Sequence, residues 1–296
     1  MSETALVSVH GGHSGQFCSH ARDSLEEVVK AYIAQGFLWV GITEHSPPDN
    51  PAFLYPEERQ AGLTPTTLRN RFAGYMAECR RLQSLYREKI TLYAAMEIET
   101  CSGYQDLVPE LLEIFQPDYI VGSVHFVDDR PIDYSAEEYF RAATLAGSLE
   151  ELYCRYFDQQ YEMISRLKPS VVGHFDLIRI FDPGYRQRLS HPEIARRIWR
   201  NLQLIRDLDL IMDLNLRALD KGAEEPYISR PILEWARELD IAVVPGDDSH
   251  GVASVGCHLA RGTALLAELG FDLHWRRPGL LRPTVAPGPL PRQNRL

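Results

Sequence analysis

Short apolar runs recur along the chain, and a polar side chain directly follows almost every one of them. Residues 6–9 precede His10, and residues 38–43 precede Glu44 and His45. Five later runs follow the same rule: 90–96 before Glu97, 119–124 before His125, 170–173 before His174, 208–214 before Asn215, and 241–245 before the segment Gly246, Asp247, Asp248, Ser249 and His250. Continuous apolar runs are typical of parallel strands buried on both faces. The pattern predicts seven such strands.

Helical periodicity fills the intervals between these runs. A helix is expected over 25–33, after the capping residues Asp23 and Ser24 and before Gly36. Further helices are expected over 65–88, 136–167 with a break at Gly147-Ser148, 192–207, 229–239 and 253–269. Alternating strands and helices predict an α/β fold with a parallel sheet, and 296 residues suffice for a (β/α) barrel. In such a barrel the carboxyl ends of the strands converge at one mouth.

Charge and composition narrow the possible partners. The formal net charge is -10, and the presumed domain has no basic patch, which argues against nucleic-acid binding. No apolar run approaches the roughly 20 residues of a membrane span, and the first residues lack a basic leader, so we expect a cytoplasmic enzyme without membrane contact. The oligomeric state cannot be derived from these features.

Residues 276–296 carry five prolines and five arginines, which predicts an extended tail after a domain formed by residues 1–275.

The five cysteines are scattered and form no CxxC pair, which argues against disulfides and a thiolate zinc site. Any metal is therefore expected to use histidines and carboxylates. Seven of the ten histidines lie at or just beyond a predicted strand end: His10, His13, His20, His45, His125, His174 and His250. Glu97 and Asp248 lie at equivalent positions. Imidazoles with a bridging carboxylate suit zinc, manganese or iron in a multinuclear hydrolytic site.

His10 and His13 are separated by Gly11-Gly12. Residues three apart on a regular strand point to opposite faces, so one metal can bind both only if a bulge or tight turn intervenes. We expect these glycines to provide it through a positive-φ or otherwise irregular backbone. Glu44 and Glu99 are candidates for orienting ligands from outside the metal centre. The other histidines, His191, His258 and His274, are expected to have structural or surface roles.

Six ordered segments resemble the polymerase and histidinol-phosphatase (PHP) superfamily, and more narrowly its histidinol-phosphatase members. They are HGGHSGQFCSH from His10, TEH from Thr43, MEIE from Met96, GSVHFVDDRPID from Gly122, GHFDLIR from Gly173 and GDDSH from Gly246. The resemblance covers about residues 6–270. It implies a distorted (β/α)7 barrel with three divalent metal ions at the carboxyl ends of the strands.

The resemblance also implies individual roles. One metal is assigned to His10, His13, Glu97 and Asp248; a second to Glu97, His125 and His174; and a third to His20, His45 and His250. Asp248 and His250 are the implied catalytic residues. The chain departs from the family at its opening, because the family usually has HxH where this sequence has His10-Gly11-Gly12-His13.

These features favour hydrolysis of a small phosphate monoester, because metal-activated water needs no side-chain nucleophile. The resemblance names L-histidinol phosphate, an intermediate of histidine biosynthesis, as substrate. Other PHP phosphoesterases, acting on nucleotides, phosphopeptides or DNA ends, and a non-catalytic metal-binding module are alternatives. An amidohydrolase is disfavoured because no lysine follows a strand. Arg179 is a candidate phosphate clamp, with a salt bridge on the following helix as the equally weighted alternative.

Overall fold

The computed structural model describes residues 4–281, and its strands occupy the seven predicted places. These strands form two sheets in which every pairing is parallel, with the orders β1-β2-β3 and β10-β9-β8-β5-β4. The strands are β1 (Val7–Ser8), β2 (Trp39–Ile42), β3 (Thr91–Ala94), β4 (Met96–Ile98), β5 (Ile120–Gly122), β8 (Val171–Val172), β9 (Ile211–Asn215) and β10 (Ala242–Gly246). The predicted α/β fold with parallel sheets is confirmed.

Backbone hydrogen bonds join the two sheets along two seams. The predicted run 90–96 is divided at Ala95 into β3, which pairs with β2, and β4, which pairs with β5. The Ala95 amide donates to the Ile42 carbonyl at 2.8 Å, so the chain passes directly from one sheet to the other. At the second seam, the Val9 amide donates to the Pro245 carbonyl at 2.9 Å. The first and last strands of the chain are therefore neighbours.

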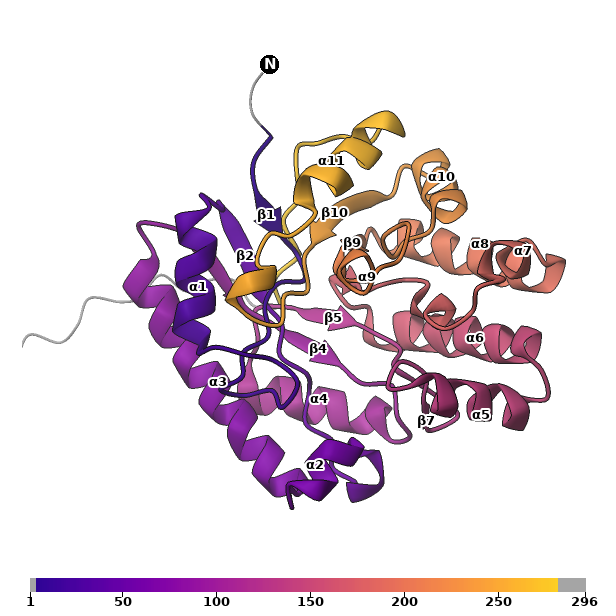
Figure 1. The fold of residues 1–296 in the computed structure, drawn as a ribbon. Helices are drawn as coiled ribbons and strands as arrows, with labels where there is room; N and C mark the ends of the chain where they lie inside the picture. Colours follow the sequence, from indigo (N-terminus) through magenta and orange to yellow (C-terminus); the bar gives the residue numbers. More distant parts are fainter. Residues whose placement is uncertain (1–3, 282–296) are drawn as a thin grey trace, which may run out of the picture.

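The helices lie outside the strands and follow the chain order around them (Figure 1). Those predicted are present as α1 (Leu25–Ala34), α3 (Pro65–Tyr86), α5 (Ala136–Ala146), α6 (Leu149–Leu167), α8 (Pro192–Asp207), α10 (Arg230–Glu238) and α11 (Leu259–Glu268). Ser24 caps α1 through a capping box with Glu27, whereas Asp23 lies outside the cap with a φ of 63°. Helix α11 begins later than predicted because a 3-10 turn, η3 (Val252–Ser254), occupies the start of that segment.

Several shorter elements and one full helix were not predicted. Helix α4 (Tyr104–Phe115) contains Pro109, and a proline inside a helical pattern is a signal for a helix end. Pro109 is the sixth residue of α4, and the helix continues past it. The other unpredicted elements are α2 (Pro56–Gln60), α7 (Tyr185–Leu189), α9 (Arg217–Asp220), the 3-10 turns η1 (Pro51–Phe53) and η2 (Leu177–Arg179), and the antiparallel pair β6 (Phe126–Val127) and β7 (Arg130–Pro131).

Two apolar clusters hold the strands in place. The larger packs the strands against the surrounding helices. The smaller consists of strand and strand-flanking side chains: Val7, Val9, Trp39, Tyr93, Ala95, Tyr119, Val121, Val171, Ile211 and Val244. Within it, the Tyr119 hydroxyl donates to the Val9 carbonyl at 2.6 Å and links β5 to the end of β1. Both sheets thus contribute to one buried layer.

The first residues of the predicted tail pack onto the domain. Arg276 forms an ion pair with Asp209, and the Leu281 amide donates to the Asp118 carbonyl at 2.8 Å. The rest of the predicted tail, 282–296, lies outside the described residues. Among residues 4–281, no helix has both the length and the apolar character needed to cross a membrane.

Candidate metal centre

The carboxyl ends of the strands surround a cavity of about 310 Å³, which we call the basin. Its lining contains seven of the nine predicted metal ligands: His20, His45, Glu97, His125, His174, Asp248 and His250. The other two, His10 and His13, are fully buried beside it. Residues separated by up to 240 positions thus meet at one place, as the strand-end pattern predicts.

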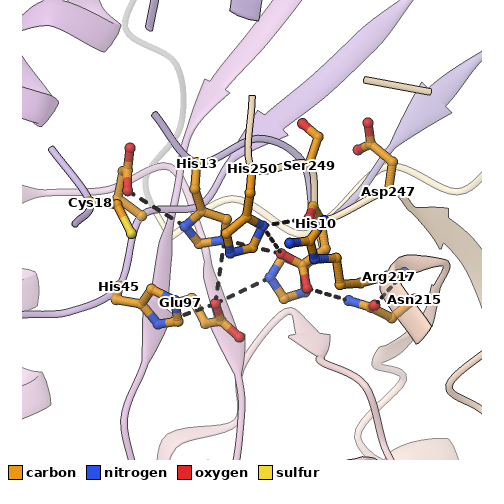
Figure 2. Close-up of polar contacts among 12 residues, drawn as sticks. His10, His13, Cys18, His45, Glu97, Asn215, Arg217, Asp247, Ser249 and His250 are labelled. Atoms are coloured by element: carbon orange, nitrogen blue, oxygen red, sulfur yellow. Dashed lines mark hydrogen bonds and ion pairs between the residues drawn. The ribbon is translucent and has the colours of Figure 1, made fainter. Parts of the chain in front are cut away.

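Glu97 lies at the centre of this arrangement and is 1% exposed. Its Oε2 atom is 3.3 Å from His10 Nε2 and 3.8 Å from His13 Nε2, whereas its Oε1 atom is 2.9 Å from His174 Nε2 and 3.4 Å from His125 Nε2. Figure 2 shows the carboxylate between the rings of His10, His13 and His45. His45 Nδ1 also lies 3.5 Å from Oε2, so the two oxygens face different sets of imidazoles, which is the arrangement required of a carboxylate that bridges two cations.

Asp248 provides a second carboxylate next to His13. Its Oδ1 atom lies 3.3 Å from His13 Nε2 and 3.6 Å from His250 Nδ1, while its Oδ2 atom accepts from Asn215 at 3.1 Å. Donor atoms within 4.8 Å of one another form five groups among the described residues, one of them His45 with Glu99 and His125. Three lie around Glu97 and Asp248: His10 with His13 and Glu97, Glu97 with His125 and His174, and His13 with Asp248 and His250. Glu97 and His13 each belong to two of these three groups.

Hydrogen bonds donated by Nδ1 orient four of the histidines. His10 Nδ1 donates to Asp213 at 2.8 Å, and Glu99 accepts from His45 Nδ1 and His125 Nδ1, each at 2.8 Å. His250 Nδ1 donates to the Asp248 carbonyl at 2.9 Å. A carboxylate or carbonyl can only accept, so each Nδ1 carries the proton and each Nε2 keeps its lone pair for a ligand. Glu99 thus has the orienting role expected from the sequence.

The residues fit a metal centre because their unpartnered atoms are lone-pair donors. Among the described residues, His10 Nε2, both ring nitrogens of His13 and His174 Nδ1 are buried without a hydrogen-bond partner. His125 Nε2 and His174 Nε2 lie only 3.2 Å apart. Buried nitrogens of this kind are costly unless a proton or a cation satisfies them. Divalent cations bound beside Glu97 and Asp248 would satisfy His10 Nε2 and His13 Nε2, the atoms that face these carboxylates.

The carboxylates strongly perturb their histidine neighbours. Burial lowers the pKa of His13, but Asp248 and Glu44 more than compensate and raise that pKa to about 9. Burial likewise lowers the pKa of His10, and Glu97, Asp248 and Asp213 raise it well above the usual value. The negative charge at the centre therefore attracts positive charge, as a proton or as a metal ion.

Two glycines allow His10 and His13 to approach Glu97 together, and their backbone is irregular without a positive φ, which is the second of the two forms expected. Neither Gly11 nor Gly12 has a positive φ. They are required because the chain is closely packed there: a Cβ atom on Gly11 would lie 2.6 Å from Val40 Cγ1, and one on Gly12 would lie 2.7 Å from Val28 Cγ1. The irregular backbone that follows β1 thus passes between β2 and α1 and turns both imidazoles toward Glu97.

The third predicted ligand set lies at the mouth of the basin. The His20 ring centroid is 5.4 Å from that of His45 and 4.9 Å from that of His250. Cys18 Sγ lies 3.3 Å from the His20 ring nitrogens and forms a possible metal-binding group with His13 and Glu44. A thiol therefore adjoins the site, although the cysteine spacing gave no indication of one.

Arg179 does not line the basin. It is 5% exposed, and its guanidinium donates to Asp176 at 3.1 Å and to the carbonyls of Glu225 and Pro226 at 3.1 and 2.6 Å. These contacts favour the salt-bridge alternative, in a buried form that holds the 225–226 segment. Arg217, which the sequence reading missed, does line the basin (Figure 2). It follows a strand end by two residues, so the rule that found the histidines could have found it.

Asp213 is the other residue that the sequence reading missed. It lies within β9 and is 0% exposed, and it fixes His10. Its position inside an apolar run concealed it. The three histidines expected to be structural lie outside the basin: His191 precedes α8, His258 is 3.0 Å from Asp220, and His274 is 2.8 Å from Asp272.

Comparison with known proteins identifies similar chains. The PHP domain model matches residues 11–217. A probable histidinol-phosphatase of Schizosaccharomyces pombe is 37% identical over 261 residues, covering 86% of this chain and 84% of that protein. The histidinol-phosphatase of Saccharomyces cerevisiae is 31% identical over 283 residues, covering 83% of this chain and 84% of that protein.

Solved structures share the fold. The HisK structure from Listeria monocytogenes aligns with a TM-score of 0.76 at 25% identity, covering 86% of this chain and 99% of that one. A histidinol phosphate phosphatase from Lactococcus lactis, solved with zinc, L-histidinol and phosphate, aligns with a TM-score of 0.68 at 19% identity, covering 90% of this chain and 94% of that one.

The central position of Glu97 predicts that Glu97→Gln binds less metal. A neutral amide cannot balance two cations, so we expect metal content to fall and turnover to drop by roughly 100-fold or more while the fold is retained. On one sample, elemental analysis measures the metal content, circular dichroism the fold, and a phosphatase assay the turnover. Glu113→Gln, an exposed change on α4, is the matched control. Full metal content in Glu97→Gln would contradict the bridging role.

The Asp213–His10 hydrogen bond predicts a metal-affinity defect in Asp213→Asn. Without the carboxylate the proton on His10 Nδ1 is no longer fixed, and we expect affinity to fall by about 10- to 100-fold. Chelator competition measures this directly. Asp209→Asn, just before β9 and paired with Arg276, serves as control. Unchanged affinity in Asp213→Asn would show that Asp213 has no orienting role.

Proposed function

The chain belongs to the PHP domain family, and from that premise we propose that it is a metal-dependent histidinol-phosphatase, which hydrolyses L-histidinol phosphate to L-histidinol and phosphate. The two relatives that carry this name are similar over more than four fifths of the chain. The observation that carries the proposal is the two-sided environment of Glu97, whose oxygens face separate pairs of buried imidazoles.

We propose three divalent ions, zinc, manganese or iron, with the ligand sets that the family pattern implies. His10, His13, Glu97 and Asp248 would hold one ion, Glu97, His125 and His174 a second, and His20, His45 and His250 a third. The donor groups around Glu97 and Asp248 support the first two sets, and the close rings at the mouth support the third. Such ions lower the pKa of water and neutralise charge on phosphoryl oxygens.

The protein's own residues would bind phosphate and move protons around this centre. Arg217 and Lys221 lie in the basin lining, and Arg217 Nε is buried without a partner, which supports Arg217 in place of Arg179 as the phosphate contact. For proton transfer we propose Asp248 and His250. His250 Nδ1 is committed to the Asp248 carbonyl, so Nε2 is the atom available at the basin.

A closed barrel would explain why these groups converge. We propose that the eight parallel strands and the helices around them form one distorted (β/α)7 barrel domain. The seams at Ala95–Ile42 and Val9–Pro245 support closure, as does the apolar cluster shared by both sheets.

The proposed function is tested by assaying the purified protein against a panel of phosphomonoesters, with metal content measured on the same sample. We expect L-histidinol phosphate to have the highest kcat/KM, and chelation to abolish activity that added divalent metal restores. Faster turnover of a nucleotide or a phosphopeptide would identify another PHP phosphoesterase. Failure to hydrolyse any phosphomonoester with metal fully loaded would contradict phosphatase function.

Arg217→Ala tests the phosphate contact. Loss of the guanidinium removes charge-assisted hydrogen bonds to phosphate, so we expect kcat/KM to fall by about 10- to 100-fold with metal content unchanged. Arg179→Ala is the comparison, because it should lower the melting temperature by breaking a buried ion pair. If Arg217→Ala kept normal kcat/KM while Arg179→Ala lost substrate affinity, the assignment would have to be reversed.

A further inference from the structure

One part of the basin lining is acidic and aromatic, and the metal centre does not use it. It is formed by Tyr55 and Glu57 at the start of α2 and by Asp133 and Tyr134 between β7 and α5. The rings of Tyr55 and Tyr134 lie 6.1 Å apart between centroids, so the two segments are side by side. Both carboxylates therefore belong to one region of the same cavity.

Both acidic side chains have an oxygen that nothing in the described chain satisfies. Glu57 and Asp133 are partly exposed as whole residues, but Glu57 Oε2 and Asp133 Oδ1 are shielded from solvent, and neither has a hydrogen-bond partner among residues 4–281. The helix cap does not account for Glu57, because its neighbour Glu58 accepts from the Tyr55 amide at 2.9 Å. A buried carboxylate oxygen without a partner is costly, and its persistence calls for a ligand that donates hydrogen bonds.

Unpartnered groups of opposite sign therefore share the basin. Arg217 Nε is unpartnered on the α9 side, where a phosphate would be bound, and the two carboxylate oxygens are unpartnered on the α2 and α5 side. A ligand complementary to this basin has a phosphate at one end and a positively charged hydrogen-bond donor at the other. The tyrosine rings add faces that attract cations.

We propose that Glu57 and Asp133 bind the cationic group of the substrate and thereby select phosphate monoesters whose alcohol carries a protonated nitrogen base. This inference rests on the proposed phosphatase function and names the residues that determine its specificity. L-histidinol phosphate offers two such groups, its amine and its imidazole. Both donate hydrogen bonds and both carry positive charge when protonated.

The variants Glu57→Gln and Asp133→Asn keep the size of the side chain and remove its charge. Each is assayed as the metal-loaded enzyme with L-histidinol phosphate, with the analogue that lacks the amine, with the analogue that lacks the imidazole, and with phenyl phosphate, which lacks both. Glu137→Gln, an exposed change on α5, is the matched control. Calorimetric binding of L-histidinol, the dephosphorylated product, gives a readout that does not depend on turnover.

We expect kcat/KM for L-histidinol phosphate to fall by about tenfold or more in each variant, mainly through KM, because a buried charge-assisted hydrogen bond is lost. Phenyl phosphate should be hydrolysed at the wild-type rate, and L-histidinol should bind more weakly by a similar factor. If the wild type and the variants hydrolyse one analogue equally well, the nitrogen base that this analogue lacks is the one that the carboxylates contact.

Equal losses on all four substrates, or no loss with L-histidinol phosphate, would overturn the inference. The proposed function is judged separately, by the wild-type preference for L-histidinol phosphate over phenyl phosphate. If the wild type hydrolysed neither, the calorimetric comparison would still decide the inference, since undiminished binding of L-histidinol by both variants would contradict it.

Discussion

The structure depends on keeping a negative charge at the end of an apolar interior. Glu97 is the middle residue of β4, its neighbours Met96 and Ile98 are both 0% exposed, and it has almost no contact with solvent. An ionised carboxylate is stable there only if positive charge surrounds it. The histidines offer their Nε2 lone pairs to cations that would supply this charge, and their own orientation requires further carboxylates, Asp213 and Glu99, behind them. The site thus places carboxylates on both sides of its imidazoles.

The strands themselves separate this polar region from a dry one. Below the site, side chains such as Trp39, Tyr119 and Val171 form an apolar layer between the sheets, and above it the strand ends present only polar groups. Close packing transmits the geometry between the regions: a Cβ atom on Gly246 would collide with Asp213, so the end of β10 fixes the carboxylate that orients His10. Small residues at strand ends therefore contribute to the site as much as its ligands do.

The strand-end pattern identified all seven strand positions and most long helices because apolar periodicity reports burial directly. The backbone conformation of the glycines and the direction of the arginine side chains were less predictable. The need for Gly11 and Gly12 comes from packing against other elements, which the local sequence does not contain. Arg217 follows a strand end by two residues, whereas the inward turn of Arg179 toward the carbonyls of Glu225 and Pro226 depends on a segment about 45 residues away. Asp213 was concealed because an apolar run hides a single inward-facing carboxylate. Glu57 and Asp133 do not follow any of the seven main strands, so the strand-end pattern makes no prediction about them.

The hydrogen bond between Val9 and Pro245 also has a consequence for synthesis. Asp248 and His250 leave the ribosome about 240 residues after His10, a delay of roughly 10–50 s at typical translation rates. During that interval His10 and His13 lack the ligands Asp248 and His250. A complete ligand set therefore requires β10 to pair beside β1, and a nascent chain exposes its early histidines to whatever cations are present before β10 is synthesised.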